Sequence, residues 1–375
     1  MARNRVIYQS EALYVSATGT ATPSQLHRVQ SANYSFEVSR TDINQFGELA
    51  AIDRIIVEQP TVSLDFSYYP TTGWNEGEIG LVMGGDSAIS ALLAQTATAT
   101  PKCYFIATAH EGQDANKLTT TQWAANVDAS GAAGIIGIGN GFLPSFSTEG
   151  SVGELLTTSV NVEALNMAFE AHEASDSAAN IAITGVLVNP INGDMISATY
   201  TLPKHDSHDT ATSSASYVNA LRHGDMELTL GTNTKGISRN DLKVQNFTWS
   251  FELSRENLEK IGSKFAFSKE IEFPTTATMD VSAILGDLVD NDSFAGLLTN
   301  DPEADLSVAC YRAGAKGSAT STDRSMKYTL LGAKLDSQSF SSSIGDNKSV
   351  DMTWTSQVGG PNDTTHGVKI EHAWS

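Results

Sequence analysis

Two short motifs contain residue types that could bind a ligand. Gly137–Gly141 is rich in glycine, but a phosphate-binding loop requires the N-terminus of a following helix, and a P-loop also requires a lysine. The sequence predicts neither after Gly141. His205 and His208 stand beside aspartates, yet a zinc site needs a third anchored ligand. We therefore expect this histidine-containing segment to be a solvated linker.

Acidic residues give further candidates for chemistry. Asp301, Glu303 and Asp305 alternate like the first ligands of a calcium-binding loop, but the central glycine and the final glutamate of an EF-hand are absent, so we expect a charged turn. Any two carboxylates could converge for glycoside hydrolysis, which the sequence leaves open. There is no Gly-x-Ser-x-Gly elbow and no Cys-x-x-Cys pair. The sequence therefore predicts no enzyme, no cofactor and no metal ion.

Four carboxylates stand out because they belong to an internal repeat. Val29–Ser67 aligns without a gap on Val244–Ser282, so the offset between the two copies is constant. A period this long predicts two homologous domains, since solenoid repeats span about 20–50 residues. The identical pairs include Val29/Val244, Gln30/Gln245, Ser35/Ser250, Glu37/Glu252, Arg40/Arg255, Gly47/Gly262 and Asp65/Asp280.

Alternating strands position these carboxylates. Tyr34, Phe36 and Val38 alternate with Ser35 and Glu37, and period two with one apolar face is typical of a half-buried antiparallel strand. The later copy and the next strand of each copy follow the same pattern. The alternation places four acids on the solvated face: Glu37, Asp65, Glu252 and Asp280.

A short helix is expected between the two strands of each copy. Serine before and glycine after the segment is the pattern of an N-cap and a C′ residue. The sequence thus predicts two-turn helices over Ser39–Gly47 and Ser254–Gly262, capped by Ser39, Gly47, Ser254 and Gly262.

Length and composition set the remaining limits. A chain of 375 residues exceeds what one core usually serves, and we predict domains over 1–204 and 218–375, joined by a polar linker at 205–217. The net charge of −20 disfavours tight binding to a phosphate backbone. No apolar run reaches the roughly 18 residues of a membrane span, and no secretory signal is expected.

The two cysteines are predicted to be buried and reduced. Cys103 and Cys310 each begin a Cys-Tyr pair in an apolar run, and a free cysteine behaves as a small hydrophobic residue. The shared dipeptide predicts that they occupy the same position in the two copies.

Three neighbouring segments, together with one later in the chain, form a recognisable pattern. They are Val29–Gly47, Leu49–Arg54, Pro60–Ser67 and Phe142–Glu154. This pattern resembles the tail tube (major tail) proteins of tailed bacteriophages. The resemblance is clearest over the first half of the chain, and the second half joins it through the internal repeat.

The resemblance implies an all-β chain with short flanking helices and two tandem homologous β-sandwich or barrel tail-tube domains. It implies a virion protein, synthesised and assembled in the host cytoplasm, that stacks as rings into the hollow tail tube through which genomic DNA passes during ejection. Three chains would form each pseudo-hexameric ring, with tape-measure and tube-end proteins as further partners. No catalytic residue is implied.

Two placements are our own inference. We expect Glu37, Asp65, Glu252 and Asp280 to line the lumen, where acids repel DNA and let it slide. We expect the two helices capped by Ser39, Gly47, Ser254 and Gly262 to lie at the contacts between subunits.

Two alternative functions remain open at this point. Another virion structural protein, such as a decoration or baseplate ring protein, would share the acidic, β-rich character. A carbohydrate-binding β-sandwich module would need exposed tryptophans on a common platform.

Overall fold

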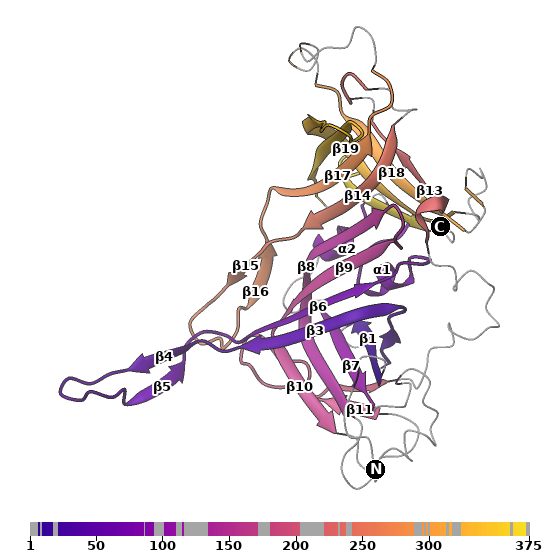
Figure 1. Ribbon diagram of the computed structural model, residues 1–375. Helices are drawn as coiled ribbons and strands as arrows, with labels where there is room; N and C mark the ends of the chain where they lie inside the picture. The colour runs from indigo at the N-terminus through magenta and orange to yellow at the C-terminus, as the bar shows by residue number, and fades with distance from the viewer. Residues whose placement is uncertain are drawn as a thin grey trace.

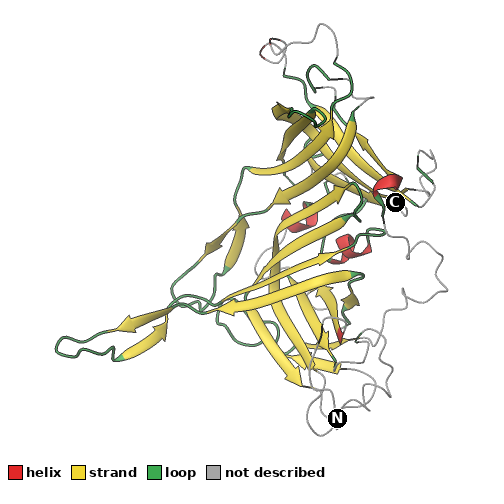
Figure 2. Cartoon of the chain, viewed as in Figure 1, coloured by secondary structure: helices red, strands yellow, loops and turns green. Residues whose placement is uncertain are grey.

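The computed structural model of the chain is built mainly of β-strands, with a few short helices (Figure 2). It describes residues 7, 10–17, 22–85, 87–93, 101–109, 115, 134–171, 181–202, 221–231, 233–237, 242–288, 295, 298, 301–312, 315–316, 324–360 and 363–372. The expected linker at 205–217, which contains His205 and His208, lies outside these ranges. The predicted domain boundary therefore stays a prediction.

The elements fall into two halves along the chain. The first half contains β1 (Glu11–Ala17), β2 (Ser24–Gln25), β3 (Val29–Glu37), β4 (Arg40–Ile43), β5 (Asp53–Ile56), β6 (Thr61–Tyr68), α1 (Trp74–Glu78), α2 (Ser90–Leu93), β7 (Lys102–Thr108), β8 (Gly134–Ser151), β9 (Thr157–Ala164), β10 (Asn166–Ala171), β11 (Ile181–Thr184) and β12 (Thr199–Leu202). The second half contains η3 (His223–Asp225), β13 (Met226–Thr229), β14 (Lys243–Glu252), β15 (Arg255–Leu258), β16 (Ser268–Ile271), β17 (Thr275–Ile284), β18 (Ala304–Tyr311), β19 (Arg324–Ser341), β20 (Ser349–Val358) and β21 (Gly367–His372).

One continuous antiparallel sheet runs through both halves (Figure 1). Its strands pair in the order β3-β6-β9-β8-β14-β17-β20-β19. The strands β8 and β14 join the halves directly, with seven residue pairs from Asn246↔Ser151 to Glu252↔Ser145. The halves are thus connected by hydrogen-bonded strands.

Two long strands connect this sheet to a second layer. Both β8 and β19 contain 18 residues. The first part of β8 pairs with β7 and β10, and the first part of β19 pairs with β18 and β21. Each long strand therefore belongs to two layers that face each other across the core.

The strand registers of the first half recur in the second half. Asn33↔Asp65 in β3–β6 becomes Thr248↔Asp280 in β14–β17, at the offset that relates Val29 to Val244 in the sequence repeat. The pair Ser147↔Ser159 in β8–β9 becomes Ser339↔Asp351 in β19–β20, at a somewhat smaller offset that is the same for both strands. In the outer layer, Thr108↔Gly134 becomes Cys310↔Met326 at that same offset between β8 and β19, so that Glu11↔Thr108 becomes Met226↔Cys310. The halves thus share a pairing scheme.

This register corrects the expected equivalence of the cysteines. Both are buried and unpaired, as predicted. However, Cys310 pairs with Met326 of β19 as Thr108 pairs with Gly134 of β8, at the offset that relates β8 to β19. Cys310 also belongs to the large hydrophobic cluster, whereas Cys103 belongs to the smaller one. The Cys-Tyr dipeptides therefore occupy different positions in the two halves.

The apolar faces of the sheet form a core shared by both halves. Along β6, Val62, Leu64, Phe66 and Tyr68 are buried and alternate with more exposed polar residues. Leu64 belongs to the same cluster as Trp249 and Trp354 of the second half. A smaller cluster, which includes Tyr14, Cys103, Phe105 and Tyr200, lies on the other side of the outer layer.

The predicted helices over Ser39–Gly47 and Ser254–Gly262 are wrong. Both segments belong to β-hairpins, in which β4 pairs with β5 and β15 pairs with β16. Gly47 and Gly262 have φ angles of 95° and 90°, which serve turns at the hairpin tips rather than helix ends. Ser39 and Ser254 precede strands and cap no helix. A glycine of positive φ is common both at the C-terminal end of a helix and in the turn of a β-hairpin.

Candidate functional site: a polar sheet face with two free edges

The exposed face of the long sheet is made of small polar residues in cross-strand rows. One row runs Ser31–Ser67–Ser159–Ser147–Ser250–Thr278–Thr355. Neighbouring hydroxyls hydrogen-bond along it: the Oγ atoms of Ser31 and Ser67 are 2.7 Å apart, and Ser250 Oγ is 2.9 Å from Thr278 Oγ1. These bonds link hydroxyl groups of neighbouring strands to one another.

The four predicted acids lie at exposed positions of this face. Asp65 and Glu252 share a row, which runs Asn33–Asp65–Asn161–Ser145–Glu252. Asn161 donates a hydrogen bond to Asp65. Thr353 Oγ1 donates to Asp280 Oδ1 at 2.6 Å, and Glu37 stands at the end of β3 opposite Thr61. The strand alternation therefore predicted the exposed face of these acids, while their place in a lumen stays a prediction.

Further acids on this face were missed, among them Glu149, Glu163 and Asp351. Glu149 of β8 stands opposite Thr157 and Thr248, and Asp351 of β20 accepts a hydrogen bond from Ser282 Oγ at 2.6 Å. The alternation of Ser145, Ser147 and Glu149 would have placed the first of them.

The face is concave and carries little positive charge. A hollow of about 310 Å³ lies over the first half and is lined mainly by serine, asparagine and Asp65. At the described exposed positions along the eight strands, the cations in the rows are Lys243, opposite Ile284, and Lys334, opposite Thr355. The amine of Lys334 lies 3.1 Å from Asp301 Oδ2. The face presents hydroxyls, amides and carboxylates to solvent.

The sheet ends in a free edge on each side. Within the described chain, β3 pairs with β6 alone, and residues 336–341 of β19 pair with β20 alone. Each edge carries an exposed aromatic residue: the exposed fraction is 62% for Phe36 and 42% for Phe340. Unpaired strand edges with apolar side chains are sites at which another chain can add a strand.

The junction between β8 and β14 shows what such an edge looks like when it is paired. Phe146 and Phe251 stack at 5.5 Å, and Trp249 meets both rings edge-on. After the last pair, Val152 N donates to Gln245 O at 2.9 Å. The junction is thus both hydrogen-bonded and filled with aromatic residues.

The two hairpins differ in their surroundings. The second hairpin (residues 255–271) lies against the first half: Arg255 Nη2 donates to Leu92 O at 2.8 Å, and Lys269 Nζ lies 3.3 Å from Glu163 Oε2. Both cations also lie over the Phe142 ring. Burial lowers the pKa of Arg255 to about 10, while the charges of Glu270 and Glu163 act against that shift.

The first hairpin (residues 40–56) projects away from the body of the molecule (Figure 1). All eight residues of β4 and β5 are exposed. Phe46 and Leu49 near its tip are fully exposed. Its apolar surface is therefore available for contact with another molecule.

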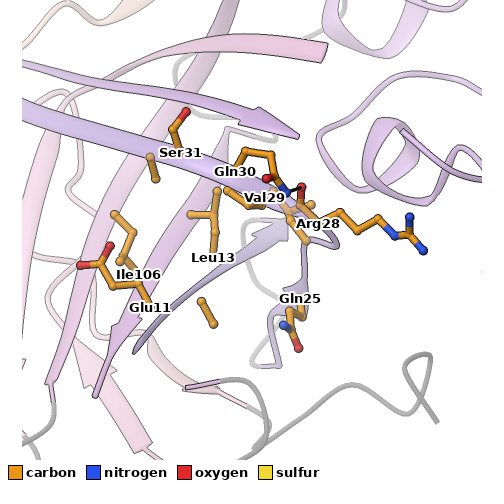
Figure 3. A pocket seen from close by; sticks show the side chains of 11 residues that line it. Glu11, Leu13, Gln25, Arg28, Val29, Gln30, Ser31 and Ile106 are labelled. Carbon is orange, nitrogen blue, oxygen red and sulfur yellow. Dashed lines mark hydrogen bonds between the residues drawn. The ribbon is translucent and has the colours of Figure 1, made fainter. Parts of the chain in front are cut away.

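A pocket of about 190 Å³ lies between the start of β3 and β1 (Figure 3). Leu13 and Ile106 line its apolar part, and Glu11 lies at its rim. Burial raises the pKa of Glu11. The guanidinium of Arg28 points away from the Glu11 carboxylate in this view.

A buried carboxyl group lies where the halves meet. Tyr68 Oη donates to Glu76 Oε1 at 2.9 Å, and burial raises the pKa of Glu76 to about 7. Burial and the charge of Glu76 both raise the pKa of Tyr328 from the second half. Sequence reasoning missed Glu76 because α1 has no pattern that predicts its burial.

The candidate chemical motifs do not assemble into a site. Gly137–Gly141 lies inside β8. Glu303 lies near His366, and Asp305 accepts a hydrogen bond from Gly332 N at 2.9 Å. Within the described ranges, no three His, Cys, Asp or Glu side chains gather as a metal site would require.

Two of the tryptophans that a sugar platform would need are buried, since Trp249 and Trp354 are at most 1% exposed. Trp123 and Trp374 lie outside the described residues. The helices in the described ranges are all too short or too polar to span a bilayer.

Comparison with known proteins finds distant similarity among solved structures. No protein-family model matches the chain, and no curated protein matches it. Among solved structures, it is similar to a chain in the cryo-EM structure of the anti-feeding prophage (AFP) baseplate, 6-fold symmetrised. The two are 12% identical, the match covers 45% of this chain and 97% of the other, and the TM-score is 0.25. A similarity this distant assigns no function.

Proposed function

We propose that this chain is a tail tube protein, a structural virion protein that forms stacked rings around a channel for genomic DNA. With this we propose that its halves are tandem homologous tail-tube domains. The observation that carries the proposal is the β8–β14 junction together with the two free edges. The recurring registers, each at a constant offset between the halves, support the homology of the halves.

The free edges match the two sides of the internal junction. The recurring registers relate β14 to β3, with Thr248 at the position of Asn33, and β19 to β8, with Ser339 at the position of Ser147. A second copy can therefore repeat the junction by pairing its β19 with β3 of the first copy. The expected register places Tyr34 opposite Phe340 and Ser35 opposite Ser339. Phe36 and Phe340 would then be covered.

Ring closure would remove both edges. A sheet that closes on itself exposes no unpaired strand, and three chains, each carrying two such units, would form a pseudo-hexameric ring. The exposed hairpin at residues 40–56 could then contact a neighbouring chain as its counterpart at 255–271 contacts the first half. The location of either hairpin at a subunit joint remains part of this proposal.

The polar face would line the channel. Each phosphate contact adds affinity for DNA and so slows passage. A wall of hydroxyls and carboxylates repels the duplex and leaves it hydrated. Glu37, Asp65, Glu252 and Asp280 are the acids that we assign to this lumen, and they are exposed on that face.

Electron microscopy of the purified protein, with its mass measured in solution, tests the proposal. We expect hollow rings or tubes of pseudo-sixfold symmetry with three chains per ring. Closed rings that never stack would favour a baseplate or decoration role. A monomer that persists at high concentration, with a positive glycan-array signal, would favour a carbohydrate-binding module.

Binding of duplex DNA gives a second test. We expect negligible binding at moderate salt. A submicromolar affinity would contradict the assignment of the polar face to a channel for passing DNA.

A further inference from the structure

The residues that line the pocket beside β3 differ from those at the matching positions of the second half. The position of Ala32 in the first half is that of Phe247 in the second, and Phe247 is buried at 5% exposure. Likewise Glu11 occupies the position of Met226. Ala32 and Glu11 both line the pocket. The first half therefore has an open, acid-rimmed space where the second half has an aromatic ring and a methionine.

The internal junction shows what would lie over this space in a repeated joint. After β8, the turn at 152–156 passes the start of β14, and Leu156 at its end is buried at 1% exposure. Leu156 N donates to Leu221 O at 3.3 Å. A Cβ atom on Gly150 would lie 2.5 Å from the Phe247 ring and 3.2 Å from Leu156 Cδ1. Leu156, Phe247 and the bare Gly150 thus fit together.

The equivalent turn after β19 has different residues. The register that relates β8–β9 to β19–β20 places Ser342 at the position of Gly150 and Lys348 at that of Leu156. Serine in place of glycine is compatible with the repeated joint, because Ala32 replaces the phenylalanine that leaves no room for a side chain. Lys348 is exposed in the single chain. A lysine stem is longer than that of leucine and ends in a cation.

We propose that Lys348 of a second copy of this chain enters the pocket beside β3 and pairs with Glu11, so that each joint between chains contains an ion pair where the internal joint contains apolar residues. The inference rests on the proposed ring. The residue differences compensate for each other in both size and charge. Ala32 is smaller than Phe247 and leaves space for a lysine longer than Leu156, and Glu11 carries the charge opposite to that of the lysine.

The charge of Glu11 supports this occupant. The carboxylate is half-buried, and within the described residues no cation pairs with it. Burial and then the charge of Glu11 raise the pKa of Tyr34 on β3. An incoming ammonium group would compensate this negative charge. A half-buried acid without a partner is costly, and a charge-assisted hydrogen bond removes much of that cost.

Charge exchange in the full chain tests the proposal. The variants are Glu11→Lys, Lys348→Glu and the double variant, with Lys316→Glu as the control because Lys316 is exposed and lies on neither edge. Ring formation is followed by mass measurement over a concentration series. We expect each single variant to raise the half-assembly concentration about tenfold or more, the double variant to recover most of the loss, and the control to match the wild type.

A second pair of variants guards against effects on folding. Glu11→Met with Lys348→Leu gives these two positions the residues of the internal joint, so we expect it to form rings whose assembly is less sensitive to salt than that of the wild type. Single variants that assemble like the wild type would overturn the ion pair. Folded single variants whose loss the double variant does not recover would overturn it too. If the wild type itself forms no rings, the proposed function fails first.

Discussion

Glu76 should make the stability of the protein depend on pH. Burial raises its pKa from 4.5 to about 7. Below pH 4.5 the side chain is protonated in both the folded and the unfolded states, so it has no effect. Between pH 4.5 and 7 the folded state keeps a proton that the unfolded state has released. The free energy of unfolding therefore falls as the pH rises through this range.

The magnitude follows from the two pKa values. At 1.36 kcal/mol per pKa unit, the loss is roughly 3 kcal/mol once both states are ionised, above pH 7. Glu76→Gln carries no charge at any pH, and its side-chain oxygen can still accept the hydrogen bond from Tyr68. We therefore expect the variant to lack this loss.

Urea unfolding between pH 4.5 and 8 measures the effect. The quantity of interest is the difference in unfolding free energy between wild type and variant at each pH, because the other acids contribute equally to both. This difference should shift in favour of Glu76→Gln by roughly 3 kcal/mol over the range. Glu154→Gln is the control, since Glu154 is exposed. Parallel pH profiles for wild type and Glu76→Gln would refute the reasoning.

Three further predictions concern the edges, the second hairpin and the polar face. Phe340→Ser should raise the half-assembly concentration about tenfold, because burying a large apolar side chain contributes roughly 1.5–3 kcal/mol; sedimentation should show no change in the monomer. Lys269→Ala should remove the ion pair with Glu163 and weaken hairpin docking by about 1–2 kcal/mol, so limited proteolysis at residues 255–271 should quicken. Asp65→Lys combined with Asp280→Lys should create salt-dependent DNA binding with a slope of roughly −2 per chain, and an unchanged, negligible affinity would contradict the role given to these acids.

Strand alternation made the polar face predictable from sequence. Residues such as Leu64 and Asp65 differ sharply in polarity, and period two then assigns each to a face. This rule placed all four predicted acids on the exposed face of the sheet. The junction between β8 and β14 could not be predicted, because it pairs strands that lie far apart in the chain and neither strand signals its partner.

The two hairpins show how a local signal can mislead. A glycine of positive φ can end a helix and can also form a tight turn. Ser39 and Gly47 at the two ends of the segment therefore did not distinguish a helix from a β-hairpin. The β-branched residues Ile52, Ile55 and Ile56 favoured the strand. The burial of Glu76 depends on contacts with Tyr68 and with the second half, which no short window of sequence contains.

The register shifts within the sheet bear on how many chains a ring would hold. They fall at matching places in the two halves: between Val29 and Ser31, Val244 and Asn246, Phe142 and Ser145, and Leu335 and Ser337. Such irregularities bend a strand and increase its twist. A head-to-tail joint closes only at one rotation per chain, about 120° for three chains, and otherwise winds into an open helix. In the proposed ring, these bends would therefore help to set the rotation between neighbouring chains and so the number of chains in a closed ring. Deletion of one residue at a register shift would change that rotation and give open helices in place of rings.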